Sequence, residues 1–153
     1  MLNNINDKIK VYVDSGATSK KFMNRYSEVC HFYQYPYDSP DRPKFSKVKL
    51  AYPSEAQWGD GNITWGEDDF TWGDYIGSEK LLEIKKIVGL GDDNRRDCLH
   101  LDSAYKTGCN IFLTSDKKDI WINRSKIKNL IVIEIFCIFE EEDKFVEYIK
   151  QSF

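Results

Sequence analysis

The chain has 153 residues, of which 41% are hydrophobic, and it carries a formal net charge of −3. This content is enough to bury one core, so we predict a single domain spanning residues 1–153. No apolar run is long enough for a membrane-spanning helix, and residues 1–10 are too polar for a signal peptide. We therefore expect a soluble, cytoplasmic protein.

Strands and helices alternate along the sequence. The pattern predicts strands over residues 9–13, 31–37, 47–52 and 131–136, and a further strand between Gly108 and Asp116. Helices are expected at about 19–30, 79–88, 94–107 and 140–151, with a loop or short helix around Trp121. This alternation favours a three-layer α/β domain with a central, mainly parallel sheet.

The middle of the chain holds three Trp-Gly-acid motifs at a seven-residue interval, beginning at Trp58, Trp65 and Trp72. Asp60-Gly61 is a hairpin signal, so we expect a β-rich meander inserted at about residues 55–75. Two interpretations of the tryptophans stay open: they close a small core, or they form a surface on which bases stack.

Four cysteines stand at positions 30, 98, 109 and 137, within apolar patterns and without paired C-x-x-C spacing. This arrangement favours buried thiols and lacks the usual spacing of a zinc site.

Three aspartates are placed where a metal site is expected. Asp14 ends the first strand, and Asp116 stands at the exit of the strand that follows Gly108. At helical spacing Asp97 shares a face with Leu101 and Ala104, so we expect it to point toward the core. A carboxylate in apolar surroundings needs a partner, and strand ends of open α/β sheets collect ligands. Such oxygen ligands suit Mg²⁺ or Mn²⁺.

These residues resemble a known family. The order strand-Asp14, Asp97-x-x-His100-x-x-x-Ala104 and Phe112-Leu113-Thr114-x-Asp116 is similar to the PIN domain, a metal-dependent nuclease fold that cuts RNA and includes the toxins of bacterial toxin–antitoxin pairs. The resemblance implies a PIN-like endoribonuclease that binds Mg²⁺ or Mn²⁺ and cleaves single-stranded or loop RNA. It implies that Asp14, Asp97 and Asp116 are catalytic metal ligands.

The family usually adds a glutamate on an earlier helix. Glu83 is the first candidate for this catalytic helper, Glu79 the second and Glu55 the third. The family also often carries an acid two residues after the Thr-x-Asp motif, where this chain has Lys118, with Asp119 one residue later.

Further residues are expected around the acids. The hydroxyls of Ser15 and Thr114, and the carboxylate of Asp119, would orient a ligand or a metal-bound water. A basic stretch follows the first strand, and within it we expect Lys20, Lys21 and Arg25 to contact RNA phosphates. His100, on a largely apolar face, is expected to be a buried imidazole that hydrogen-bonds locally.

Two alternatives to the nuclease share part of this sequence pattern. A degenerate PIN-like module that binds RNA or a protein without cleavage would explain the missing helper acid. A phosphatase of the haloacid dehalogenase type is excluded, because it needs a second aspartate where this chain has Gly16. The sequence leaves open an antitoxin-like protein partner and a homodimer.

Overall fold

The structure is a computed structural model that describes residues 8–14, 20–35, 37, 48–54, 77–115 and 117–152. The predicted meander at 55–75, with its tryptophans, lies outside the described residues, as do Ser15, Glu55 and Asp116.

The described strands form one sheet in which every pair is parallel. In spatial order β3-β2-β1-β4-β5, the strands are Val48–Leu50, Cys30–Gln34, Ile9–Val13, Ile111–Thr114 and Glu134–Cys137. The predicted α/β class and the parallel central sheet are thereby confirmed.

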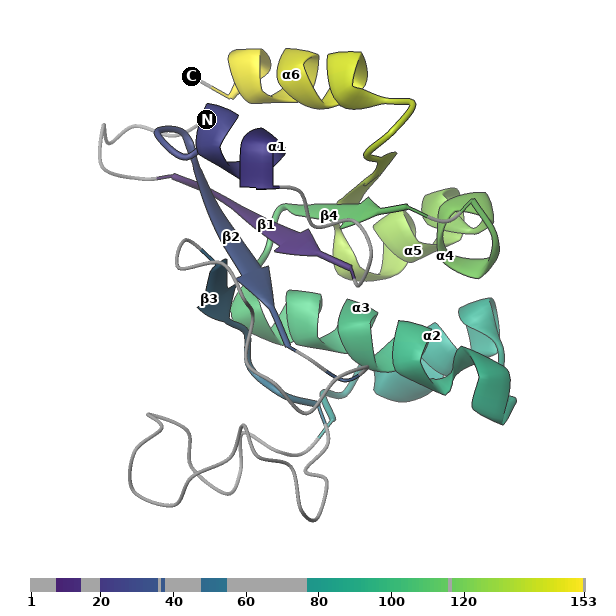
Figure 1. The fold of residues 1–153 in the computed structure, drawn as a ribbon. Helices are drawn as coiled ribbons and strands as arrows, with labels where there is room; N and C mark the ends of the chain where they lie inside the picture. Colours follow the sequence, from purple (N-terminus) through teal and green to yellow (C-terminus); the bar gives the residue numbers. More distant parts are fainter. Residues whose placement is uncertain are drawn as a thin grey trace, which may run out of the picture.

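Helices cover both faces of this sheet (Figure 1). One face carries α1 (Lys20–Arg25) and α6 (Glu142–Gln151). The other carries α2 (Leu81–Val88), α3 (Arg95–Thr107), α4 (Asp119–Ile122) and α5 (Arg124–Ile131). Right-handed crossovers explain this division, because the chain moves from β1 toward β3 in one direction and from β3 toward β5 in the other. A three-residue 3₁₀ turn, η2 (Asp92–Asn94), precedes α3.

Strand β1 lies in the middle of the sheet and alternates between the two cores. Its residues Ile9, Val11 and Val13 are buried with α1 and α6. Tyr12 is buried on the opposite face with α3. Because side chains two residues apart share a face, Asp14 points to the same side as Tyr12. This parity directs the carboxylate that follows β1 toward α3.

The structure corrects the predicted strand at 131–136. Ile131 ends α5, Val132 adopts a left-handed backbone conformation with φ of 52°, and the strand runs only from Glu134 to Cys137. The continuous apolar run therefore joins a helix end to a strand. The helix was missed because only Ile127 and Ile131 of its eight residues are buried, which leaves a weak apolar stripe.

Other boundaries agree more closely. Helix α1 ends at Arg25 rather than near Cys30, whereas α2 and α3 end where glycines were expected. Gly108 takes the left-handed conformation, with φ of 79°, that lets glycine terminate a helix.

The four cysteines are free and buried, as predicted. Burial raises the pKa of the Cys30 and Cys109 thiols to about 12 and that of Cys98 to about 11, so these three are not reactive thiolates. In the part of the chain that the structure describes, no helix has the length and apolar character required to cross a membrane.

Candidate active site

The candidate site lies at the carboxyl ends of β1 and β4. These neighbouring strands flank the point where the sheet order reverses, since the chain leaves β1 toward β2 and β3 and returns to β4 on the other side. Ligands of open α/β sheets bind at such a point. Asp14 directly follows β1, and its carboxylate Oδ2 accepts a hydrogen bond from the hydroxyl of Thr114, the last residue of β4, at 3.3 Å.

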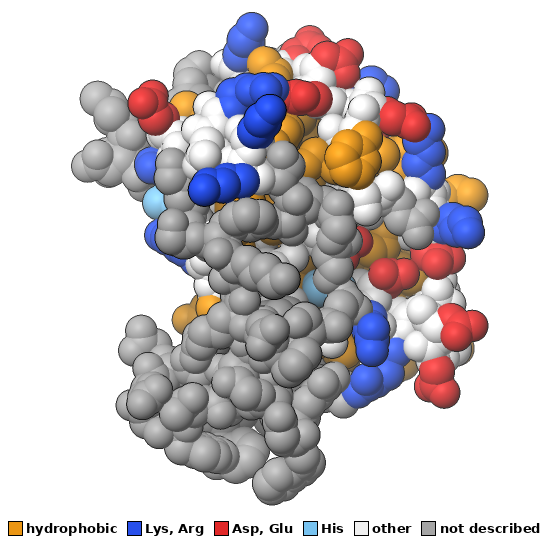
Figure 2. Space-filling model, viewed as in Figure 1, with side chains coloured by type: hydrophobic (Ala, Val, Ile, Leu, Met, Phe, Trp, Pro, Cys, Tyr) orange, Lys and Arg blue, Asp and Glu red, His pale blue; other side chains and the backbone are white. Residues whose placement is uncertain are grey.

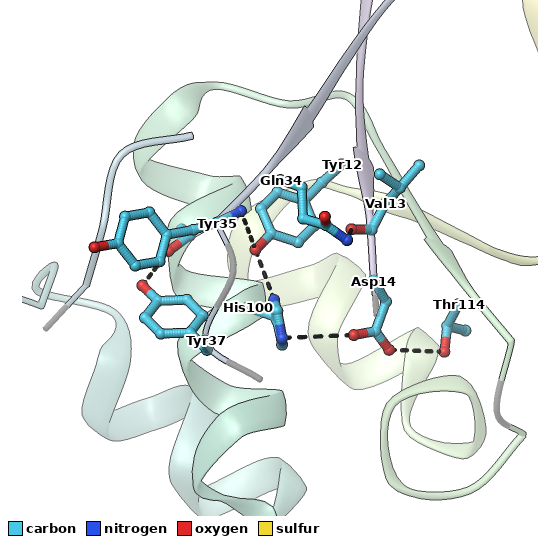
Figure 3. A network of polar contacts seen from close by, with 9 residues as sticks. Tyr12, Val13, Asp14, Gln34, Tyr35, Tyr37, His100 and Thr114 are labelled. Carbon is cyan, nitrogen blue, oxygen red and sulfur yellow. Dashed lines mark hydrogen bonds and ion pairs between the residues drawn. The ribbon is translucent and has the colours of Figure 1, made fainter. Parts of the chain in front are cut away.

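Helix α3 supplies the second group that faces Asp14. His100 is 1% exposed and lies between the side chains of Tyr12 and Asp14, which both point toward α3 (Figure 3). Its Nδ1 is 2.6 Å from the Tyr12 hydroxyl, and its Nε2 is 3.7 Å from Asp14 Oδ1. The ring of Tyr37 packs edge-on against the imidazole, with centroids 5.1 Å apart. The expected burial of this histidine is confirmed, but its hydrogen bond runs to a distant strand rather than to a local partner.

The hydrogen bonds around Tyr12 indicate which ring nitrogen of His100 accepts a hydrogen bond and which carries the N–H. The main-chain N–H of Tyr35 donates to the Tyr12 oxygen at 3.1 Å. Burial raises the pKa of Tyr12 well above its ordinary value, so the phenol keeps its proton and can donate it to Nδ1. That arrangement leaves the N–H of His100 on Nε2, facing Asp14. The carboxylate is thus held between a hydroxyl on β4 and an imidazole on α3.

Replacing Tyr12 by Phe tests this chain of hydrogen bonds. The variant leaves the Tyr35 N–H and His100 Nδ1 without their common partner, so we expect the free energy of unfolding to fall by about 1–3 kcal/mol. Urea denaturation measures the change. Tyr33→Phe on β2 is the matched control, because it keeps the ring beside Lys10 and Lys49, and it should change stability by less than about 0.5 kcal/mol.

Asp97 lies in the first turn of α3, beyond the buried part of the helix. The helix runs opposite to β1, since Lys10 Nζ bonds the Thr107 carbonyl at one end and His100 meets Asp14 near the other. Asp97 precedes His100 by one turn on the same side, about 4.5 Å farther along the axis. It therefore stands at the carboxyl end of the sheet, but half-buried, which corrects the expectation of a core-facing acid.

The charges near the start of α3 include one more predicted residue. Asp97 and Asp119 both raise the pKa of the Cys98 thiol, after the larger effect of burial, while Lys85 of α2 lowers it. Asp119 begins α4, which follows β4, with an unusual backbone φ of 27°. The structure thus brings Asp119 toward the same end of α3 as Asp97.

The acid that is fully buried on α3 is Asp102, which the sequence analysis did not single out. Its carboxylate accepts hydrogen bonds from the Ser54 hydroxyl at 2.6 Å, from the Ser78 N–H at 2.9 Å and from the Ser78 hydroxyl. The neighbouring Ser103 hydroxyl bonds that of Tyr37 at 2.5 Å. These contacts fasten residues 37, 51–54 and 77–78 to α3. The available signal was a polar pair, Asp102-Ser103, inside an otherwise apolar stretch.

The candidate helper acids have other partners in the structure. Glu83 is about half exposed on α2 and pairs with Lys86 at 3.2 Å. Glu79 accepts a hydrogen bond from the Tyr105 hydroxyl at 2.6 Å. Neither of these two contacts involves Asp14, and the helper role of either glutamate stays a prediction.

The predicted phosphate contacts lie on α1, over which lysine and arginine side chains gather in Figure 2. Lys20 and Lys21 are exposed in the first turn, which follows the carboxyl end of β1 by six residues. Arg25, at the other end of this helix, pairs with Glu142 of α6 at 2.5 Å. Position therefore favours the two lysines as the groups nearer to the site.

Among the described residues, no three His, Cys, Asp or Glu side chains gather as a metal-holding group. Comparisons with protein-family models, curated proteins and solved structures gave no match to this chain.

Proposed function

We propose that this chain is a metal-dependent endoribonuclease of the PIN-like type, acting on single-stranded or loop RNA. The observation that carries the proposal is the carboxylate of Asp14. It stands at the switch point of a parallel sheet and is held by Thr114 from one strand and His100 from the facing helix. A carboxylate fixed at this position is typical of a site that acts on a ligand.

The donor set fits Mg²⁺ or Mn²⁺. These ions are commonly held by one or two carboxylates, with waters and substrate phosphate oxygens as the remaining ligands. The proposed carboxylate ligands are Asp14 and Asp97, which the structure describes, and Asp116, which follows Thr114 by two residues in the sequence. When bound, the ion would polarise a phosphate and lower the pKa of a water.

The surrounding residues would orient the groups that react. Thr114, through a hydrogen bond, and His100, at 3.7 Å, would orient the Asp14 carboxylate. Lys20 and Lys21 would attract the RNA backbone at the same sheet edge. The buried rings of Tyr12 and Phe112 stack on the α3 face of the sheet, with centroids 5.3 Å apart, and the Tyr12 ring packs beside His100.

One observation favours the alternative, a PIN-like module that binds RNA without cutting it. The described residues include no three-ligand metal group, and Glu83 pairs with Lys86 instead of facing Asp14. The two functions differ in one measurable property, the metal dependence of RNA cleavage.

Purified protein incubated with a mixed pool of single-stranded RNA and Mg²⁺ or Mn²⁺ should cleave it, and excess EDTA should abolish cleavage. Asp97→Asn should lower the rate at least about a hundredfold, because a neutral amide neither balances the charge of the ion nor holds it as firmly. Asp93→Asn, at an exposed acid just before α3, is the matched control and should cleave like the parent.

Equal background in all samples, combined with RNA binding in a gel-shift assay, would overturn the nuclease and establish the binding module. Cleavage that EDTA does not affect would overturn the metal mechanism.

A further inference from the structure

A groove runs along the outer side of β5, which β4 separates from β1 and Asp14. In the described sheet order β5 is the last strand, and a hollow of about 250 Å³ lies beside it, between α5 and α6. Three cationic side chains line this hollow, namely Arg124 and Lys128 from α5 and Lys144 from α6.

The main chain of β5 presents hydrogen-bonding groups to this groove. The N–H groups of Glu134 and Ile138 donate toward β4, to the carbonyls of Asn110 and Thr114 at 3.0 and 2.9 Å. Because successive residues of a strand direct these groups to opposite sides, Ile133, Ile135 and Cys137 direct theirs outward. The Cys137 N–H already receives the carboxylate of Glu141 at 3.0 Å. One outward main-chain N–H of β5 is thus already bonded to a carboxylate oxygen of the same chain.

Arg124 adds a guanidinium to the lining of the groove. Its guanidinium lies over the Trp121 ring, 3.9 Å from the centroid, and this stacking fixes its plane. Within the described residues its Nη1 is buried and has no hydrogen-bond acceptor. Glu141 Oε1 is 4.0 Å away, too far for a hydrogen bond.

The carboxylate of Glu141 has other partners. It accepts hydrogen bonds from Cys137 N–H, from the Trp121 indole at 2.7 Å and from Lys144 at 3.1 Å. Burial alone would raise the pKa of Glu141, but these hydrogen bonds and the Lys144 charge lower it below its ordinary value. Glu141 is therefore satisfied by other donors, and it pairs with Arg124 only at ion-pair distance.

The charge of the groove favours an acidic ligand. Its three cations face two carboxylates, with Lys128 paired to Glu134 and Lys144 to Glu141. Both lysines are more than half exposed, so these pairs contribute little and exchange partners readily. The groove carries excess positive charge in a chain whose net charge is −3.

We propose that the outer edge of β5 binds an acidic, extended segment of a partner protein as an added strand. A carbonyl of the segment accepts a hydrogen bond from the Ile135 N–H, and a carboxylate of the segment pairs with the guanidinium of Arg124, whose side chain is 38% exposed. A second copy of this chain fits less well, because a two-fold contact places the same cations opposite one another. A nucleic acid offers no main-chain groups to the strand. The proposal is independent of the nuclease.

The test uses a fluorescein-labelled hexapeptide of alternating Thr and Glu, with fluorescence anisotropy as the readout. We expect saturable binding, and no binding of the peptide in which Lys replaces Glu. Methylating the alternate amides that face β5 should weaken binding about tenfold, while methylating the other set should not. Arg124→Gln should also weaken binding about tenfold. Lys126→Gln, at an exposed α5 position outside the groove, should leave binding unchanged.

Circular dichroism establishes that the Arg124→Gln variant is folded. If it is not, Lys144→Glu provides the second test, since it reverses an exposed charge of the rim and should weaken binding several-fold. Absence of binding at roughly 1 mM peptide overturns the proposal, as does equal binding of both peptides. Tighter, Arg124-dependent binding of an oligouridylate would assign the groove to nucleic acid. Dimerisation lost in Arg124→Gln would assign it to a second copy.

Discussion

The Asp14→Asn variant is expected to lose RNA cleavage by a factor of about a thousand while keeping its fold. Asparagine has the same shape and still accepts the Thr114 hydroxyl, so the contacts of β1 and β4 persist. What disappears is a negative charge at the switch point of the sheet, which the proposed metal ion requires. Single-turnover cleavage of a fluorescent single-stranded RNA at saturating Mg²⁺ measures the loss.

The matched control is Asp143→Asn, which removes an exposed charge from α6. It should cleave at the parent rate, and both variants should unfold in urea within about 1 kcal/mol of the parent. An Asp14→Asn protein that cleaves normally would show that this carboxylate is not part of the catalytic machinery.

Asp102→Ala is expected to cause the largest loss of stability, about 3–5 kcal/mol. The substitution removes the common acceptor of the Ser54 hydroxyl and of the Ser78 hydroxyl and N–H, and leaves these donors buried without it. It also leaves a void at a position that is 0% exposed. The midpoint and slope of urea denaturation give the change in the free energy of unfolding.

Two comparisons sharpen this experiment. Asp92→Ala, at an exposed acid before α3, should leave stability nearly unchanged. Ser54→Ala removes only one of the donors and should cost about 1 kcal/mol. If Asp102→Ala were no more harmful than Asp92→Ala, Asp102 would not be the anchor of the loops that α3 holds.

The features predicted correctly are those that local patterns determine. The alternation of Ile9, Val11 and Val13 marks β1, Gly108 marks the end of α3, and the predicted helix at 140–151 corresponds to α6. Each is a short-range consequence of strand or helix periodicity or of glycine's backbone freedom. Their order along the chain was sufficient to predict a parallel α/β sheet.

The errors arise where tertiary packing decides. Asp97 is at helical spacing with the apolar residues Leu101 and Ala104, but it is only half-buried. A periodic pattern does not show that the first turn of a helix extends beyond the core. Asp102 falls on the same helix, whose residues 98–104 are all buried, so periodicity did not distinguish an inner side from an outer one. The partners of Asp102, Ser54 and Ser78, are distant in sequence, and no local rule pairs them.

The sequence predicted some residues of the candidate site but not the contacts between them. Its acids were chosen by position at strand ends, and the structure places Asp14 and Thr114 together. His100 contacts both Tyr12 and Asp14 because α3 packs against β1. The sequence does not reveal that these two elements face each other. Metal binding, RNA cleavage, an antitoxin-like partner and a homodimer stay predictions.

The pairing of β1 with β4 also has a consequence for how the protein folds. Asp14 and Thr114 are separated by 100 positions, yet they share a hydrogen bond at the centre of the sheet. Contacts between such distant segments form slowly, because a long loop must close before any interaction compensates for its entropy. During synthesis β1 waits for β4 to emerge, so the Asp14 site assembles only after most of the chain has been made.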